Sequence, residues 1–230
     1  MELDNKVVLI TGAKGGLGTF VTNSFLEAGA RVVGVSRSIS SSDFPRERFS
    51  AMPAELSNGD SARKLVETVA EQWGRIDGLV YLIGGFAGGQ SIADTDDATL
   101  ERMLDLNLRS AFYIIRAVLP RMRERESGRI IAIGSKAAVE PAPMAGVYAA
   151  SKAGLVSLIR TVARENTDKH IAANVLLPGT MDTPANRAAD PGADFSKWVN
   201  PCQVARLALH LMSNAASQIS GAAIPVDGGA

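Results

Sequence analysis

Short apolar runs alternate with longer helical patterns along the whole chain, and this alternation limits the possible folds more than any other feature of the sequence. The apolar runs predict strands at residues 7–11, 31–35, 49–54, 78–83, 129–134, 172–177 and 222–226. Apolar residues at helical spacing predict helices at residues 17–28, 61–73, 97–125, 147–165 and 202–212. Repeated strand-helix-strand units of this kind predict an α/β fold, a Rossmann-type doubly wound parallel sheet of about seven strands with helices on both faces.

The composition favours one globular domain. Hydrophobic residues make up 46% and charged residues 21% of the 230 residues, which is enough apolar material for one sizeable core. We find no internal repeat, low-complexity tract or linker, and we therefore interpret residues 1–230 as a single domain. Residues 178–201 are rich in Pro, Gly, Ala and Asp with little periodicity, which predicts a mobile loop beside a site.

Charge, cysteine and histidine content exclude several kinds of partner. Lysine plus arginine and aspartate plus glutamate are balanced at 24 each, so no strong field would draw the chain to nucleic acid or to an anionic membrane. Cys202 is the sole cysteine, and neither His170 nor His210 lies in a ligand pattern, so we expect no metal site. Without a signal-peptide pattern or a run of about 18 apolar residues, we expect a cytoplasmic protein with a small-molecule substrate.

A glycine-rich turn, TGAKGGLG at residues 11–18, joins the first predicted strand to the first predicted helix. Backbone N–H groups and the positive end of the helix can hold a pyrophosphate there, and glycines permit the tight turn and the close approach. An ordinary strand-to-helix turn could also contain glycines, but the position between strand and helix favours a dinucleotide site. The turn residues that we assign to cofactor binding are Gly12, Lys14, Gly16, Leu17 and Gly18.

Polar and basic residues follow the second predicted strand, where NAD-binding folds carry an acidic residue for the ribose 2′-hydroxyl. The sequence here is Ser36-Arg37-Ser38, whose guanidinium and hydroxyl groups suit a 2′-phosphate, and Lys14 adds charge from the facing turn. The two cations could instead be solvated surface charges. We interpret the pattern as a preference for NADPH over NADH. The expected neighbours on the adenine side are Glu55 and Leu56.

Tyr148 and Lys152 are four residues apart on a predicted helix, so their side chains share one face. A free tyrosine has a pKa of about 10, and a neighbouring ammonium would bring that pKa closer to neutrality. Ser135 ends the fifth predicted strand, where its hydroxyl could hold a substrate oxygen beside the phenol. Tyr-x-x-x-Lys is common by chance, but this position in the fold favours a catalytic Ser, Tyr and Lys group.

Asn107 lies inside a long apolar helical pattern, where a buried amide needs partners. Two interpretations stay open for this residue. It could be a satisfied core amide that shapes the helix, or it could take part in proton transfer through water.

Together these segments resemble the short-chain dehydrogenase/reductase family from residue 7 to residue 229. Besides the glycine turn and the residues above, the likeness includes NVLLPG at residues 174–179 and VDGG at residues 226–229. The resemblance implies that Lys152 binds the nicotinamide ribose and that Asn107 belongs to a proton relay. It also implies that the nicotinamide carboxamide and a nearby phosphate are held by Pro178, Gly179, Met181 and Thr183.

One departure from the family lies after the fourth strand, where YLIG at residues 81–84 replaces Asn-Asn-Ala-Gly. Gly84 still allows the backbone to approach a bound cofactor closely, and we assign Gly84 and Gly85 to the cofactor site. Because the asparagines normally brace the centre of the sheet, we expect apolar side chains to fill this region instead.

A closer likeness is to the quinonoid dihydropteridine reductase branch, which reduces a pterin with NADH. It rests on GGFAGG at residues 84–89, KAA at 136–138, DTPANR at 182–187 and ADFSKW at 193–198. Ser135 stands where that branch carries alanine, and Ser36-Arg37 replaces its acidic ribose binder, so we expect the cofactor to differ. Phe86 and Trp198 are candidates for an aromatic substrate pocket, although aromatics at such positions more often only pack.

The sequence therefore predicts an NADPH-dependent oxidoreductase that transfers hydride to a carbonyl or quinonoid, pterin-like substrate, with Tyr148 as general acid. Two alternatives stay open: a non-catalytic NADP(H)-sensing regulatory protein, and an NAD(P)-dependent alcohol dehydrogenase that runs toward oxidation. The joint presence of Ser135, Tyr148 and Lys152 argues against the sensor. The family resemblance also implies a homodimer or homotetramer packed through the helices around residues 100–122 and 147–165.

Overall fold

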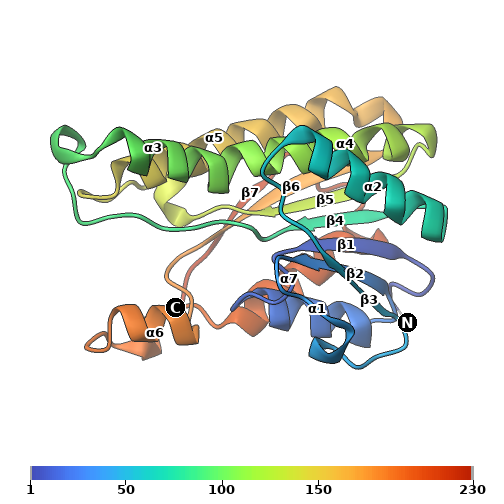
Figure 1. Cartoon of the computed structure of the whole chain (residues 1–230), viewed down its shortest axis with the longest axis horizontal. Coiled ribbons are helices and arrows are strands. Elements are labelled where there is room, and N and C mark those ends of the chain that lie inside the picture. Colours follow the sequence, from blue (N-terminus) through green and yellow to red (C-terminus); the bar gives the residue numbers. More distant parts are fainter. Residues whose placement is uncertain (1, 229–230) are drawn as a thin grey trace.

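The computed structural model describes residues 2–228 and contains a seven-stranded parallel sheet in the order β3-β2-β1-β4-β5-β6-β7 (Figure 1). The strands are β1 (Val7–Thr11), β2 (Arg31–Ser36), β3 (Phe49–Pro53), β4 (Gly78–Tyr81), β5 (Gly128–Ile133), β6 (Ile171–Pro178) and β7 (Ala223–Val226). The predicted doubly wound sheet is confirmed, and each predicted strand is present: β1 has the predicted bounds, and the other strands differ slightly at one or both ends. Gly229 of the closing motif lies outside the described residues.

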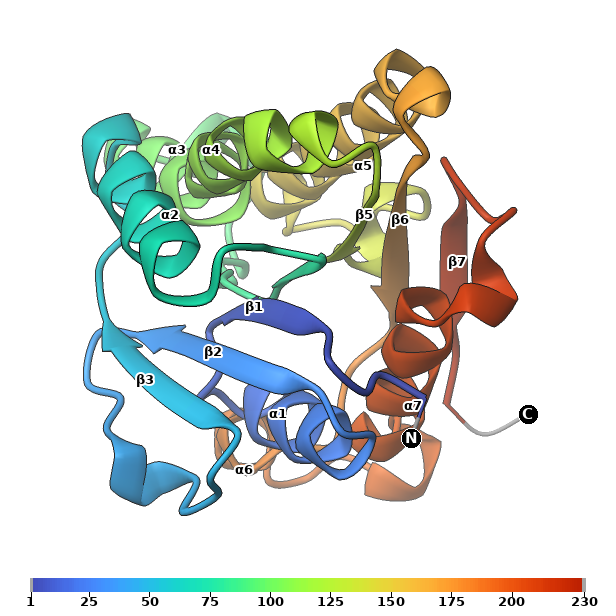
Figure 2. The same cartoon turned by 90° about the vertical axis from the view of Figure 1, so that its right-hand side faces the viewer.

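Helices cover both faces of this sheet. The helices α1 and α7 pack together on one face, and α2, α4 and α5 cover the other (Figures 1 and 2). The helices are α1 (Gly18–Glu27), α2 (Gly59–Trp73), α3 (Asp97–Leu104), α4 (Ser110–Glu124), α5 (Gly146–Glu165), α6 (Pro184–Ala189) and α7 (Pro201–Met212). Within residues 2–228, no helix combines the length and the apolar character needed to cross a membrane.

Two hydrophobic layers hold the helices to the sheet, because successive side chains of a strand point to opposite faces. In β1, Val7 and Leu9 join the layer beneath α2, α4 and α5, whereas Val8 and Ile10 join the layer beneath α1 and α7. Every residue of β1 is buried, as expected for a strand covered on both faces. The continuous apolar run in the sequence is therefore a direct consequence of the two-sided burial.

The strand order reverses next to β1, which has β2 on one side and β4 on the other. The chain moves outward from β1 through β2 to β3 and then returns to β4, so the loops after β1 and β4 diverge. In open α/β sheets, ligands bind in the crevice at the carboxyl ends of the strands where such a reversal occurs. The fold thus places the candidate site between the turn after β1 and the loop after β4.

Two segments differ from the sequence-based prediction. The helical region predicted at 97–125 consists of α3, a π-helical turn at Asp105–Arg109, and α4. The region predicted as an irregular loop contains α6, whose N-cap is Thr183 and which has proline in its first turn. The Thr183 side chain accepts a hydrogen bond from the backbone N–H of Asn186 (3.3 Å), which is a recognised helix start.

Candidate active site

The turn between β1 and α1 can exist only with glycine at its tightest positions. Gly12 has a φ of +70°, a region that L side chains rarely adopt. A Cβ on Gly18 would overlap the carbonyl oxygen of Gly12, and a Cβ on Gly16 would lie 3.2 Å from the Thr183 side chain. No side chain caps the start of α1 at Leu17, so its first N–H groups face the turn without a side-chain acceptor. This geometry suits a phosphate group.

Leu17 contributes to this turn through its backbone, because its side chain is buried in the core beneath α1. Leu56, expected on the adenine side, is likewise buried in the opposite core layer. Glu55 is exposed just beyond β3. Of this predicted adenine-side pair, only Glu55 therefore presents its side chain to solvent.

The structure brings the glycine turn and the end of β2 together, as predicted. The Lys14 backbone N–H donates to Ser36 Oγ (3.3 Å), and Lys14 Nζ donates to the Ser38 carbonyl oxygen (3.2 Å). Arg37 is exposed between the two serines. Lys14 Nζ also forms an ion pair with Asp43 Oδ1 (2.8 Å), a partner that sequence reasoning missed.

Thr183 and the end of β6 complete the cofactor side of the site. Pro178 and Thr183 are buried, while Gly179 and Met181 are partly exposed between them. The Thr183 side chain lies against Gly16, so the segment after β6 meets the turn after β1 although the two are far apart in the sequence. Of the four residues that the family resemblance placed beside the nicotinamide, Thr183 therefore adjoins the glycine turn.

The centre of the sheet is braced by Tyr81 in place of the family's asparagines. Its ring is fully buried in the core, and its hydroxyl donates to the Leu106 carbonyl oxygen (2.9 Å) and shares a 2.6 Å hydrogen bond with Ser110 Oγ. Burial raises the pKa of Tyr81. The prediction of purely apolar packing was wrong in this respect, because a buried phenol needs a hydrogen-bond partner and finds two here.

Asn107 is completely buried in the π-helical turn and is fully hydrogen-bonded. Its Oδ1 accepts from the Gly85 N–H (2.9 Å), and its Nδ2 donates to the Gly85 carbonyl oxygen and to Ser151 Oγ (both 3.0 Å). These contacts agree with the satisfied core amide. They tie the loop after β4 to the first half of α5, and so hold Gly85 beside this helix.

Lys152 is buried, and its Nζ donates to the Ile133 carbonyl oxygen at the end of β5 (3.0 Å). A Cβ on Gly84 would lie 3.0 Å from the same Nζ, so the glycine makes room for the ammonium. Burial lowers the pKa of Lys152 to about 8. The lysine therefore reaches the meeting point of β4, β5 and α5.

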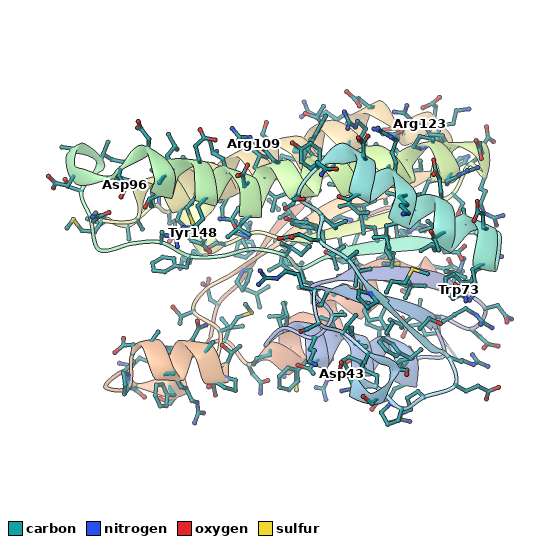
Figure 3. All side chains as sticks on the ribbon, in the orientation of Figure 1. Asp43, Trp73, Asp96, Arg109, Arg123 and Tyr148 are labelled. Atoms are coloured by element: carbon teal, nitrogen blue, oxygen red, sulfur yellow. The ribbon has the colours of Figure 1, made fainter. Side chains whose placement is uncertain are left out.

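Tyr148 lies one turn before Lys152 on α5, at the end of the molecule toward which α6 also projects (Figures 1 and 3). Burial raises the pKa of the Tyr148 phenol, and hydrogen bonding with Ser135 acts in the opposite direction. The sequence predicted a fall in this pKa caused by Lys152, whereas the net shift is a rise caused by burial, and Lys152 Nζ is hydrogen-bonded to the Ile133 carbonyl oxygen. The phenol is therefore protonated at neutral pH, with a pKa further from neutrality than that of a free tyrosine.

Ser135 follows β5 after Gly134, and its Oγ accepts from the Ala137 N–H (3.2 Å) and caps a short 3₁₀ turn. Ser135 influences the pKa of the Tyr148 phenol, so these two groups are neighbours, and Lys152 Nζ reaches the carboxyl end of β5.

Phe86 and Trp198 do not form one aromatic pocket. Phe86 is 68% exposed and packs edge-on against Tyr148, with 5.0 Å between ring centroids. Trp198 instead packs on Phe195, with 4.7 Å between centroids, in the segment after α6. A cavity of about 290 Å³ adjoins Phe86 and is not lined by Trp198. Its lining includes Arg102, Met144, Gly146 and Val147, which sequence reasoning missed because no local motif marks them.

Among residues 2–228, no group of three or more His, Cys, Asp or Glu side chains lies close enough together to hold a metal ion. Cys202 is a free cysteine at the start of α7.

The sheet reversal, the glycine turn and the Ser135, Tyr148 and Lys152 group define the site of a dinucleotide-fold oxidoreductase. Residues 6–194 match the short chain dehydrogenase family. The chain belongs to this family and is a short-chain dehydrogenase/reductase enzyme.

Individual relatives and solved structures agree with this membership. The chain is 33% identical over 249 residues to the rhamnolipids biosynthesis 3-oxoacyl-[acyl-carrier-protein] reductase of Pseudomonas aeruginosa, covering 99% of this chain and 97% of that relative. It superposes on ElxO with NADP bound with a TM-score of 0.91 and 23% identity, covering 97% and 98% of the two chains. NAD⁺-bound xylitol dehydrogenase gives a TM-score of 0.90 with 21% identity and complete coverage of both chains. The two structures support the fold.

Proposed function

We propose that this enzyme uses NADPH to reduce a carbonyl or quinonoid substrate, with Tyr148 as the general acid. The observation that carries the proposal is the position of Tyr148, which lies one turn before the buried Lys152 on α5 and packs edge-on against Phe86 beside a cavity. Tyr148 donates its proton to the substrate oxygen or nitrogen, and Ser135 Oγ holds that atom beside the phenol. Lys152 supplies a buried cation at the end of β5.

The cofactor assignment is supported by the space at the glycine turn. Gly12, Gly16 and Gly18 leave a cradle that a Cβ would fill, and the start of α1 has no side-chain cap. When bound, the nicotinamide cofactor supplies the hydride. Lys14 and Arg37 would face the adenine-side ribose and favour a 2′-phosphate. ElxO binds NADP and xylitol dehydrogenase binds NAD⁺, so relatives of this fold use either form.

Asn107 would support the chemistry without contacting the substrate, by positioning other groups. It positions Ser151 and Gly85, and a water in contact with Lys152 could pass a proton toward Tyr148 through this region. We propose this relay on the basis of the family resemblance, with Asn107 as a positioning residue.

The substrate class is supported by the cavity next to Phe86 and by the relatives. The Pseudomonas aeruginosa relative is named as a 3-oxoacyl reductase, which favours a ketone group. The exposed Phe86 ring beside Tyr148 would suit a flat quinonoid or pterin-like substrate as well. We further propose that residues 1–230 form one domain, that the protein is cytoplasmic, and that it assembles as a homodimer or homotetramer.

Turnover with a panel of acceptors tests this function. Purified protein is mixed with NADPH or NADH and with ketones, quinones or a quinonoid pterin, and loss of reduced nicotinamide absorbance is recorded. We expect turnover of at least one class, with a higher kcat/KM for NADPH than for NADH. Alcohols with NADP⁺ are tested in the same way for the reverse reaction. If the protein binds NADPH tightly but turns over none of the acceptors and none of the alcohols, the proposal is contradicted and a cofactor sensor is favoured.

A further inference from the structure

Asp43 is held in a fixed position next to the proposed adenine-side pocket. It ends a 3₁₀ turn at Ser41–Asp43, and its Oδ2 accepts from the Ser40 backbone N–H (2.8 Å) and from Ser40 Oγ (3.3 Å). The residues that flank the turn, Ile39 and Phe44, are buried in the core beneath α1. Phe44 also packs on Phe49 of β3, with 4.8 Å between ring centroids. The carboxylate is therefore anchored by folded structure.

Asp43 directs the Lys14 side chain across the end of β2. Lys14 Nζ lies 2.8 Å from Asp43 Oδ1 and 3.2 Å from the Ser38 carbonyl oxygen, while the Lys14 backbone N–H is bound to Ser36 Oγ (3.3 Å). The ammonium thus bridges the glycine turn and the segment after β2. Two of its possible hydrogen bonds already go to protein oxygens.

This arrangement matters for a 2′-phosphate. Such a group carries close to two negative charges at neutral pH, and the proposed pocket offers it Lys14 and Arg37. The Asp43 carboxylate lies beside the same ammonium, and hydrogen bonding with Lys14 lowers the pKa of Asp43, so it is ionised at neutral pH. A phosphate approaching Lys14 meets this like charge and competes with it. A ribose 2′-hydroxyl carries no charge and meets no such repulsion.

We propose that Asp43 is a specificity-determining residue that weakens NADPH binding by occupying Lys14 and opposing the 2′-phosphate, and so narrows the preference for NADPH over NADH. This inference rests on the proposed function, because it assumes that a nicotinamide dinucleotide occupies the glycine turn. It assigns the selectivity of the site to an acidic residue outside the Ser36-Arg37-Ser38 segment.

Equilibrium binding of both cofactors tests the inference with Asp43→Asn. The asparagine can still accept from the Ser40 N–H, so the turn is retained while the charge is removed. We expect the Kd for NADPH to fall about three- to fivefold at low ionic strength, as for one exposed charge pair, while the Kd for NADH is unchanged. Added salt should shrink the difference, since exposed charges are screened.

Glu67→Gln provides the matched control, because Glu67 is an exposed acid on α2, which covers the other face of the sheet. Glu67→Gln changes the net charge by the same amount as Asp43→Asn, and we expect it to change neither the Kd for NADPH nor the Kd for NADH. If the Kd for NADPH is unchanged or higher in Asp43→Asn, or if the Kd values for both cofactors fall equally, the specificity role of Asp43 is refuted and the proposed function is unaffected. Failure of the unmodified protein to bind either cofactor would refute the proposed function itself, and this inference with it.

Discussion

Lys152 brings a positive charge into the interior, and the fold does little to compensate it. Its Nζ makes one hydrogen bond, to the Ile133 carbonyl oxygen, and burial lowers its pKa from 10.5 to about 8. A charged group that loses water on folding destabilises the folded state in proportion to the shift of its pKa. The site therefore carries a stability cost that belongs to its function.

Replacing this lysine should stabilise the protein while impairing its activity. We expect Lys152→Met to raise the free energy of unfolding by on the order of 2 kcal/mol at pH 7, after allowing for the lost hydrogen bond. The destabilisation caused by the buried Lys152 ammonium is fully present below pH 8 and disappears as pH rises toward 10.5. Over that interval the lysine is still protonated in the unfolded chain but has lost its proton in the folded protein. Denaturant unfolding at pH 7 and pH 10 should show a smaller gain at the higher pH.

The exposed Lys64 on α2 provides the comparison for this measurement. Lys64→Met should leave both the stability and its pH dependence nearly unchanged. A Lys152→Met variant that is less stable than the unmodified protein at pH 7 would show that the buried ammonium is compensated by its surroundings.

Sequence reasoning identified the residues whose relation is local and missed those that depend on distant segments. Tyr148 and Lys152 share a face because helical spacing requires it. Asp43 was missed, since its contact with Lys14 depends on how the loop after β2 folds back toward the turn after β1. The direction of the Lys152 ammonium was also beyond prediction, because it depends on the backbone of β5.

At the scale of elements, the π-helical turn between α3 and α4 connects the loop after β4 to α5, which carries Tyr148 and Lys152. The widened turn directs Asn107 inward, where its amide holds both backbone groups of Gly85 and the Ser151 hydroxyl. π-helical turns inside α-helices are frequent at functional sites, which agrees with this position.

Loss of this amide should loosen the connection. We expect Asn107→Ala to lower the free energy of unfolding by about 2–3 kcal/mol, because the Gly85 N–H and C=O are left without their partner. Thermal unfolding followed by circular dichroism measures the change. Asn214→Ala, at an exposed site, should have almost no effect. Equal unfolding midpoints for the two variants would mean that water replaces the amide at little cost.

The strands were predictable from the sequence and the irregular elements were not. Strands such as β1 are buried on both faces, which leaves an unbroken apolar run in the sequence. The π-helical turn has the same apolar periodicity as its neighbours, and α6 is only one short helix among glycines and prolines. The cap formed by Thr183 and the proline after it were the signals that could have revealed α6.

At the scale of the whole molecule, the α3 and α4 side exposes several large apolar side chains. Leu100, Leu106 and Phe112 are 36%, 38% and 42% exposed, respectively. The Arg116 guanidinium lies 5.0 Å from the centre of the Phe112 ring. This surface coincides with the helices through which we expect subunits to pack.

Sedimentation should therefore show a homodimer or homotetramer that a charge on this surface weakens. We expect Phe112→Asp to shift the protein toward smaller species, since an aspartate buried in an interface without a partner is unfavourable. Phe20→Asp gives the control, because Phe20 is similarly exposed at 37% but lies on α1, on the opposite face of the sheet. Identical sedimentation of the two variants would place the interface elsewhere.

The proton donated by Tyr148 is the step on which the proposed activity depends, and single-turnover kinetics measure it directly. Stopped-flow oxidation of saturating NADPH is compared for the unmodified protein and Tyr148→Phe, with an acceptor from the panel. Because the variant keeps the ring and loses only the hydroxyl, we predict a rate lower by about 10²- to 10⁴-fold, the contribution of a general acid. Equal rates for the two proteins would contradict the assignment of Tyr148 as proton donor.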